Sequence, residues 1–145
     1  MVIEPEVGLV IRYDYLWKNE QEAGLESGLK DRPCAVVLVS KARSDESRMI
    51  VVCPITHSPA SNPRHSVEIP PKVAQHLGLD DVRSWVRTNT VNTFTWEAGL
   101  VPIGVSPATT ERWGFGMLPR ALGERVFNQI RDNSRAGPIE TVARS

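Results

Sequence analysis

Apolar residues in this chain fall into short, β-branched runs rather than long helical repeats. Two such runs, Cys34–Val39 and Met49–Cys53, are separated by a polar, turn-rich stretch from Ser40 to Arg48. Short β-branched runs bounded by turn residues are typical of buried strands. A polar connection of this kind favours a hairpin. We therefore predict an antiparallel hairpin in the first half of the chain.

Further strands are predicted on both sides of this hairpin. Apolar residues dominate Gly8–Trp17, and polar and apolar residues alternate over His65–Ile69. The segment 84–95 is rich in Thr, Val, Trp and Phe, which favours another strand. A short strand is also expected at 100–103. These elements make the predicted fold mainly β.

Two helices complete the prediction. Lys72–Leu77 follows a proline and precedes Gly78, which is the usual punctuation of a short helix. Pro119–Asn133 is a longer helix, because its apolar residues recur every fourth position as one stripe: Leu118, Leu122, Val126 and Ile130. The polar stretch Lys18–Lys30 has no sustained periodicity, so a mobile loop is expected there, with a short helix as the alternative.

The chain reads as one domain over residues 1–135. No repeat, low-complexity tract or Pro/Gly-rich linker divides its 145 residues, and 41% of them are hydrophobic, enough for a genuine core. Residues 136–145 are expected to form a flexible C-terminal tail. Several short strands with one terminal helix indicate a small, curved β-barrel or partly open sheet with a packed helix, an α+β arrangement.

Composition narrows the functional classes. The formal net charge is 0, so the whole molecule is not a polycation, and any contact with nucleic acid must depend on a few local cations. No apolar run approaches the roughly 18 residues of a membrane span, and the amino terminus lacks the order of a signal peptide, so a cytoplasmic protein is expected. Cys34 and Cys53 lie inside the two hairpin strands and are interpreted as buried hydrophobes.

Polar residues at the open end of the hairpin are the leading site candidate. Arg32 precedes the first strand, and Thr56 and His57 follow the second. In an antiparallel pair the start of one strand lies beside the end of the next. These three side chains should therefore meet at one edge of the sheet. A guanidinium, a hydroxyl and an imidazole together suit a phosphate or an RNA sugar.

The order of these elements resembles the PemK/MazF toxins of bacterial toxin–antitoxin systems. Gly8 precedes a first strand, and a loop then leads to Arg32-Pro33 and an apolar strand. A second strand ends in Pro54-Ile55-Thr56, and a later polar strand follows Gly78-Leu79. An amphipathic helix closes the chain. The resemblance covers roughly residues 6 to 132.

The resemblance implies a fold and an activity. The implied fold is a PemK/MazF/CcdB-like, SH3-like barrel that forms a homodimer. The implied activity is cleavage of single-stranded RNA without a metal ion or other cofactor, inhibiting growth until a small antitoxin binds the toxin. Two alternatives stay open: a non-catalytic toxin that poisons a protein such as DNA gyrase, and a degenerate relative that binds RNA without cutting it.

The resemblance also implies roles for named residues. The recurrent active-site pair of the family falls on Arg32 and Thr56, and Arg87 matches an arginine that some members use as the acid. Their base is an aspartate two residues later, where this chain has Asn89, and an amide does not accept a proton as a carboxylate does. Because its ordinary pKa lies near neutrality, His57 is hypothesised to supply or share the acid–base function.

Substrate binding is expected from residues around the two polar loops. Trp17 borders the first loop and is the best candidate to stack on a base. Lys30, Arg64 and Asn89 are the remaining candidates. Structural roles are the competing interpretation: Arg32 pairing with a neighbouring carboxylate (Asp14 or Asp31), Thr56 forming a turn, and the tryptophans filling the core.

Overall fold

The computed structural model describes residues 4–80, 82–108 and 113–144. Its strands are β1 (Leu9–Tyr13), β2 (Arg32–Val39), β3 (Arg48–Thr56), β4 (Ser66–Ile69), β5 (Ser84–Arg87), β6 (Thr90–Trp96), β7 (Val105–Ser106), β8 (Gly114–Met117) and β9 (Glu140–Ala143). Its helices are α1 (Lys18–Glu22), α2 (Pro71–Leu77) and α3 (Arg120–Ala136), and Pro63–His65 form a single 3-10 turn, η1. No helix within these residues is long and apolar enough to cross a bilayer.

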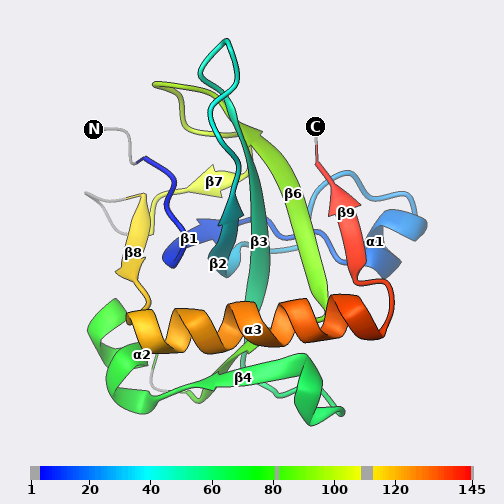
Figure 1. The fold of residues 1–145 in the computed structure, drawn as a ribbon, viewed down its shortest axis with the longest axis vertical. Coiled ribbons are helices and arrows are strands. Elements are labelled where there is room, and N and C mark those ends of the chain that lie inside the picture. The colour runs from blue at the N-terminus through cyan, green and yellow to red at the C-terminus, as the bar shows by residue number, and fades with distance from the viewer. Residues whose placement is uncertain (1–3, 81, 109–112, 145) are drawn as a thin grey trace.

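The strands form one sheet that curves around its longest member. The main order is β4-β5-β3-β2-β1-β7, while β8 also pairs with β1. β3 pairs with β6 along its first part and with β5 at its end. Figure 1 shows β3 between β2 and β6. β9 runs parallel to β6, and the other pairings are antiparallel. The result is the small, partly open β-barrel with a C-terminal helix that the sequence predicts.

The predicted hairpin is confirmed. β2 and β3 pair antiparallel with Cys34 opposite Pro54 and Ala35 opposite Cys53, and a β-bulge interrupts the register after Val36. The two cysteines belong to different core clusters, and both are free and buried. They are the small buried hydrophobes that the sequence indicates.

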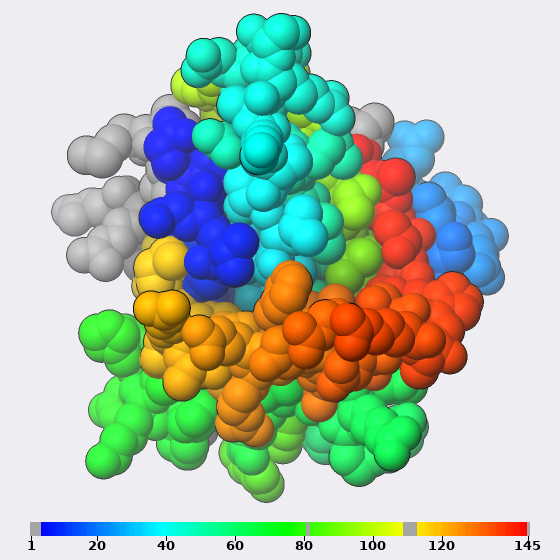
Figure 2. All heavy atoms as spheres, in the orientation of Figure 1, coloured from blue at the N-terminus to red at the C-terminus, as the bar shows by residue number. Residues whose placement is uncertain are grey.

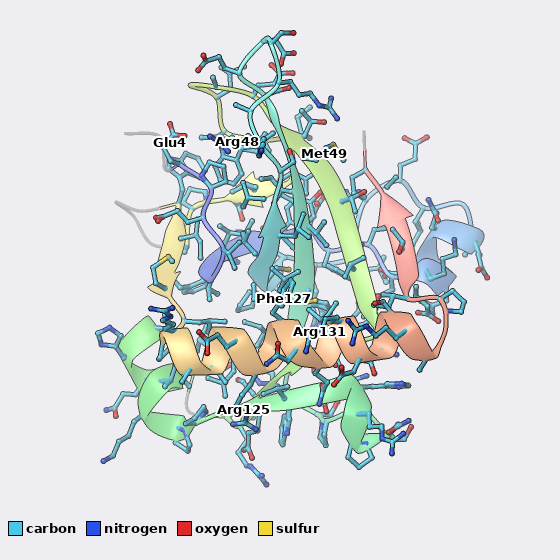
Figure 3. The ribbon with its side chains drawn as sticks, viewed as in Figure 1. Glu4, Arg48, Met49, Arg125, Phe127 and Arg131 are labelled. Atoms are coloured by element: carbon cyan, nitrogen blue, oxygen red, sulfur yellow. The ribbon has the colours of Figure 1, made fainter. Side chains whose placement is uncertain are left out.

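The predicted apolar stripe of α3 is confirmed as its packing face. Leu122 and Val126 are buried against the sheet, and Ile130 packs at the edge of the same cluster. Burying a side chain of this size contributes about 1.5–3 kcal/mol. In Figure 2, α3 forms a continuous ridge across this face of the molecule. Its outer side carries exposed side chains, among them those labelled in Figure 3: Arg125, Phe127 and Arg131.

The segment 84–95 forms two strands rather than one. β5 ends at Arg87 and β6 begins at Thr90. Between them, the Thr88 amide donates to the His65 carbonyl at 2.8 Å, and Asn133 Nδ2 of α3 donates to the Thr88 carbonyl at 3.0 Å. These bonds hold a bend that turns the chain from one part of the sheet to the next.

The short strand expected at 100–103 is wrong. This segment is a loop in which Ile103 is 91% exposed, and strand structure resumes at β7. Pro102 has no N–H to donate to a strand ladder, and its carbonyl instead accepts from the Val105 amide at 3.1 Å.

The stretch Lys18–Lys30 begins with the short helix α1 and continues as an irregular loop. The Trp17 amide donates to Glu20 Oε1 at 3.0 Å, which fixes the start of α1. Near the other end, the Gly28 amide donates to the Asp14 carbonyl at 3.2 Å. A Cβ on Gly28 would lie 2.2 Å from the Tyr15 carbonyl oxygen, so this close approach requires glycine.

The C-terminal segment carries an ordered strand where the sequence analysis expects a flexible tail. β9 pairs with β6, and its Val142 is buried. Beyond it, Arg144 Nη2 lies 3.1 Å from Asp14 Oδ1 and Nη1 donates to the Asp14 carbonyl at 2.9 Å. The pairing with β6, a buried apolar side chain and an ion pair therefore attach this segment to the rest of the fold.

Candidate active site

A cavity of about 650 Å³ lies where β2 begins and β3 ends. Cys34 pairs with Pro54, and continuing this register by two residues sets Arg32 opposite Thr56. Arg32, Thr56 and His57 all line the cavity. The structure therefore brings together the three side chains that the hairpin geometry predicts to meet.

β5 adds Arg87 to the same cavity, because Ile55 pairs with Val86. Arg87 Nε donates to Thr56 Oγ1 at 3.3 Å, and the Thr56 hydroxyl in turn donates to the Ser58 carbonyl at 2.8 Å. The Arg87 guanidinium also donates to the Ser58 and Pro59 carbonyls, each at 3.3 Å. Carbonyl oxygens of the loop after β3 thus orient Arg87 without neutralising it.

Arg32 enters the cavity without a carboxylate partner among the described residues. Its Nε is buried and makes no hydrogen bond there. Its guanidinium carbon lies 5.2 Å from the centre of the Trp17 ring. Asp14 pairs with Arg144 instead, and Asp31 lies 3.8 Å from Arg12. The ion-pair interpretation of Arg32 is therefore not what the structure shows.

The two arginines repel each other across the cavity. Burial, and after it the positive charge of Arg32, lower the pKa of the Arg87 guanidinium from its ordinary value. No ion pair to either arginine is found within the described residues. An anion placed between them would relieve this repulsion. Guanidinium groups bind phosphate oxygens in this way, often in pairs.

His57 is held by acceptors on both ring nitrogens. Nε2 lies 2.9 Å from Asp80 Oδ2, and Nδ1 lies 3.3 Å from the Arg83 carbonyl oxygen. A neutral imidazole has one N–H, so it satisfies one of these acceptors, whereas the imidazolium satisfies both. Both ring nitrogens of His57 therefore face an acceptor, and these two contacts fix the orientation of the ring.

Two further predicted residues line the cavity, and two do not. Trp17 and Lys30 line it. Arg64 lies on η1 with its side chain exposed, and its carbonyl accepts from Asn133 on α3. Asn89 lies in the bend after β5, where its carbonyl accepts from the Glu140 amide at 3.1 Å. Both are thus placed among the contacts near α3 and β9, away from the cavity lining.

Sequence reasoning missed three charged residues of the cavity: Arg12, Asp31 and Asp80. Asp31 and Asp80 supply carboxylates to this cavity, whose lining does not include Asn89. The pairing of β1 with β2 sets Arg12 opposite Pro33, beside Arg32. Among the described residues, no group of three His, Cys, Asp or Glu side chains is arranged to hold a metal ion.

Comparison with known families identifies the class of protein. Residues 13–111 match the family described as PemK-like, MazF-like toxin of type II toxin–antitoxin system. The match covers more than half of the chain and includes the cavity residues from Trp17 to Arg87. The chain therefore belongs to this family of toxins, for which a cognate antitoxin is the expected partner. No curated protein gives a significant match to the chain.

Proposed function

We propose that this toxin is an endoribonuclease that cleaves single-stranded RNA without a metal ion. The observation that carries the proposal is the convergence of Arg32, Thr56 and Arg87 in one cavity, with no carboxylate paired to either arginine in the described part of the chain. Two such guanidinium groups supply the positive charge that the cleaved phosphate requires.

The reaction uses the ribose 2′-OH as an internal nucleophile on the adjacent phosphorus. The new O–P bond forms as the bond to the 5′-oxygen breaks, leaving a 2′,3′-cyclic phosphate and a free 5′-OH. Arg32 and Arg87 would stabilise the charge that builds on the phosphoryl oxygens. Thr56 would hold Arg87 in place through its hydroxyl, whose own proton is donated to the Ser58 carbonyl.

Proton transfer is assigned to the groups around His57. The imidazolium, held by Asp80 and the Arg83 carbonyl, would protonate the leaving 5′-oxygen after a rotation of the exposed ring. A cavity carboxylate would accept the proton of the 2′-OH, and Asp80 is the one that contacts His57. Asn89 takes no part, because it lies outside the cavity lining.

The remaining properties follow from the family. We infer a homodimer that acts in the cytoplasm, inhibits growth by cutting messenger RNA, and is neutralised by its cognate antitoxin. Trp17 and Lys30 would contact the RNA on either side of the cleaved phosphate.

The test is an end analysis of RNA incubated with the purified protein in excess EDTA. The proposal expects fragments with 2′,3′-cyclic phosphate or 3′-phosphate ends from the wild type, and at least about 100-fold slower cleavage by Arg32→Ala. Arg135→Ala, an exposed arginine on α3, is the matched control. If the purified protein leaves the RNA intact while its expression still arrests growth, the result would instead favour poisoning of a protein target.

A further inference from the structure

The cavity contains a carboxylate that phosphate chemistry leaves unexplained. Asp31 lines it next to Arg32 in the chain. A carboxylate repels a phosphate, so its presence beside two phosphate-binding arginines points to a different part of the RNA. Arg12 and Trp17 line the same cavity and also lie outside the proposed phosphate contacts.

Asp31 is oriented by two neighbours that contact the same oxygen. Ser106 Oγ donates to Asp31 Oδ2 at 2.7 Å, and Arg12 Nε lies 3.8 Å from that atom. Both neighbours are fixed by the sheet, because Arg12 pairs with Ser106 across β1 and β7. Asp31 Oδ1 has no hydrogen-bond partner in the described part of the chain. The carboxylate is therefore held on one side and keeps an acceptor for a ligand.

The Watson–Crick edges of the four RNA bases respond differently to such a carboxylate. Guanine presents two adjacent donors, N1–H and N2–H, which match the two oxygens of a carboxylate. Adenine and cytosine present one donor beside a ring nitrogen that is an acceptor, and uracil presents one donor between two carbonyls. Each of these three would place a lone pair against the carboxylate, so the carboxylate selects guanine.

The neighbours of Asp31 suit the rest of the base. The Arg12 guanidinium has donors beyond Nε that would bind guanine O6, the pairing that makes arginine a common guanine contact. The half-buried indole of Trp17 lines the same cavity with the Arg32 guanidinium carbon 5.2 Å from its ring centre, and the rest of its surface would contact the base. We propose that Asp31 and Arg12 form a guanine-recognition subsite, so that the RNA is cleaved next to a guanine. This inference rests on the proposed function, because the guanine reaches Asp31 only when the phosphate of the same nucleotide is bound by Arg32 and Arg87.

Binding of the four nucleoside 3′-monophosphates, measured by calorimetry or by NMR shifts, tests the subsite without any cleavage. The wild type is expected to bind 3′-GMP about 10- to 100-fold more tightly than 3′-AMP, 3′-CMP or 3′-UMP. Asp31→Asn should lose that preference while its 3′-AMP affinity stays within about twofold. Arg32→Ala should weaken all four ligands together. Equal binding of the four by the wild type, or an equal loss of all four in Asp31→Asn, would overturn the subsite.

Arg12→Gln provides a second variant on another strand, in case Asp31→Asn does not fold. It should lower the 3′-GMP affinity alone, and an unchanged 3′-GMP affinity would count against the subsite. Cleavage mapping separates this inference from the proposed function. Cleavage at sites without a neighbouring guanine would overturn the subsite and leave the nuclease standing. Selective 3′-GMP binding by a protein that cuts no RNA would support the subsite and remove the nuclease.

Discussion

Arg87 Nε donates to Thr56 Oγ1 at 3.3 Å, and the Thr56 hydroxyl donates its own hydrogen to the Ser58 carbonyl at 2.8 Å. The lone pairs of the hydroxyl are therefore available to Arg87. We therefore propose that Thr56 positions the Arg87 guanidinium rather than acting as a base.

Replacing Thr56 separates this role from simple space filling. Thr56→Val keeps the shape of the side chain but removes both hydrogen bonds, whereas Thr56→Ser keeps the hydroxyl. We expect Thr56→Val to lower the single-turnover cleavage rate by about 100-fold, because a displacement near 1 Å in a catalytic group has that effect. Thr56→Ser should stay within about tenfold of the wild type. A Thr56→Val protein as fast as Thr56→Ser would contradict the positioning role.

Arg32 should make the unliganded protein less stable. Its buried Nε has no partner in the described residues, and its charge helps to lower the pKa of Arg87. Arg32→Met removes both penalties, so the free energy of unfolding should rise by about 1 kcal/mol while cleavage is lost. Inorganic phosphate should raise the melting temperature of the wild type and leave that of Arg32→Met nearly unchanged. A variant that melts lower than the wild type without phosphate would refute this account.

His57 should set the pH dependence of cleavage. If the imidazolium donates the proton to the leaving oxygen, the wild-type rate falls as the pH rises through the range in which the ring loses its charge. His57→Gln removes the titrating group, so its residual rate should be flat across that range. His76→Gln is a matched control, since His76 is exposed on α2 and does not line the cavity. An unchanged profile in His57→Gln would remove His57 from the reaction.

The two cysteines should be unreactive in the folded protein. Burial raises the pKa of both thiols above the ordinary value, so the reactive thiolate is scarcer in the native state than in the unfolded chain at the same pH. At pH 8 we expect no labelling of native Cys34 or Cys53 by a disulfide reagent over a period that labels both in denaturant. Fast labelling of the native protein would show that the hairpin opens readily.

The last residues should contribute to stability. Arg144→Ala leaves Asp14 without its partner in a partly buried pair, which should cost about 2 kcal/mol in the free energy of unfolding. Arg135→Ala, exposed on α3, should change it by less than about 0.5 kcal/mol. Chemical denaturation of the two variants compares them directly. Equal stabilities would mean that the ion pair contributes nothing.

The parts of the fold predicted from sequence are those fixed by local periodicity. In the β2–β3 hairpin and on α3, the buried apolar residues follow one another in a regular local pattern. That pattern can be read directly from the sequence. The meeting of Arg32 and Thr56 follows from antiparallel pairing alone. These predictions required no knowledge of how distant segments pack.

The missed features depend on contacts between distant segments. β9 pairs with β6 about 50 residues earlier in the chain, and no local signal marks that parallel pairing. Asp31 accepts a hydrogen bond from Ser106 of β7, and Asp80 contacts His57 from the loop after α2. Arg64 and Asn89 have suitable chemistry and sequence position, but contacts with α3 and β9 place them outside the cavity lining. Their residue types made them candidates for RNA binding, whereas the packing of distant segments determined their positions.

Single-turnover cleavage of a mixed-sequence RNA in EDTA, followed by analysis of the fragment ends, tests most directly whether this cavity is a ribonuclease active site. We expect the wild type and Arg135→Ala to produce 2′,3′-cyclic phosphate ends at equal rates. Arg32→Ala and Arg87→Ala should each be slower by at least about 100-fold. Two results would contradict the assignment of this cavity as a ribonuclease active site: cleavage by Arg32→Ala and Arg87→Ala at the wild-type rate, or no cleavage by any of the four proteins.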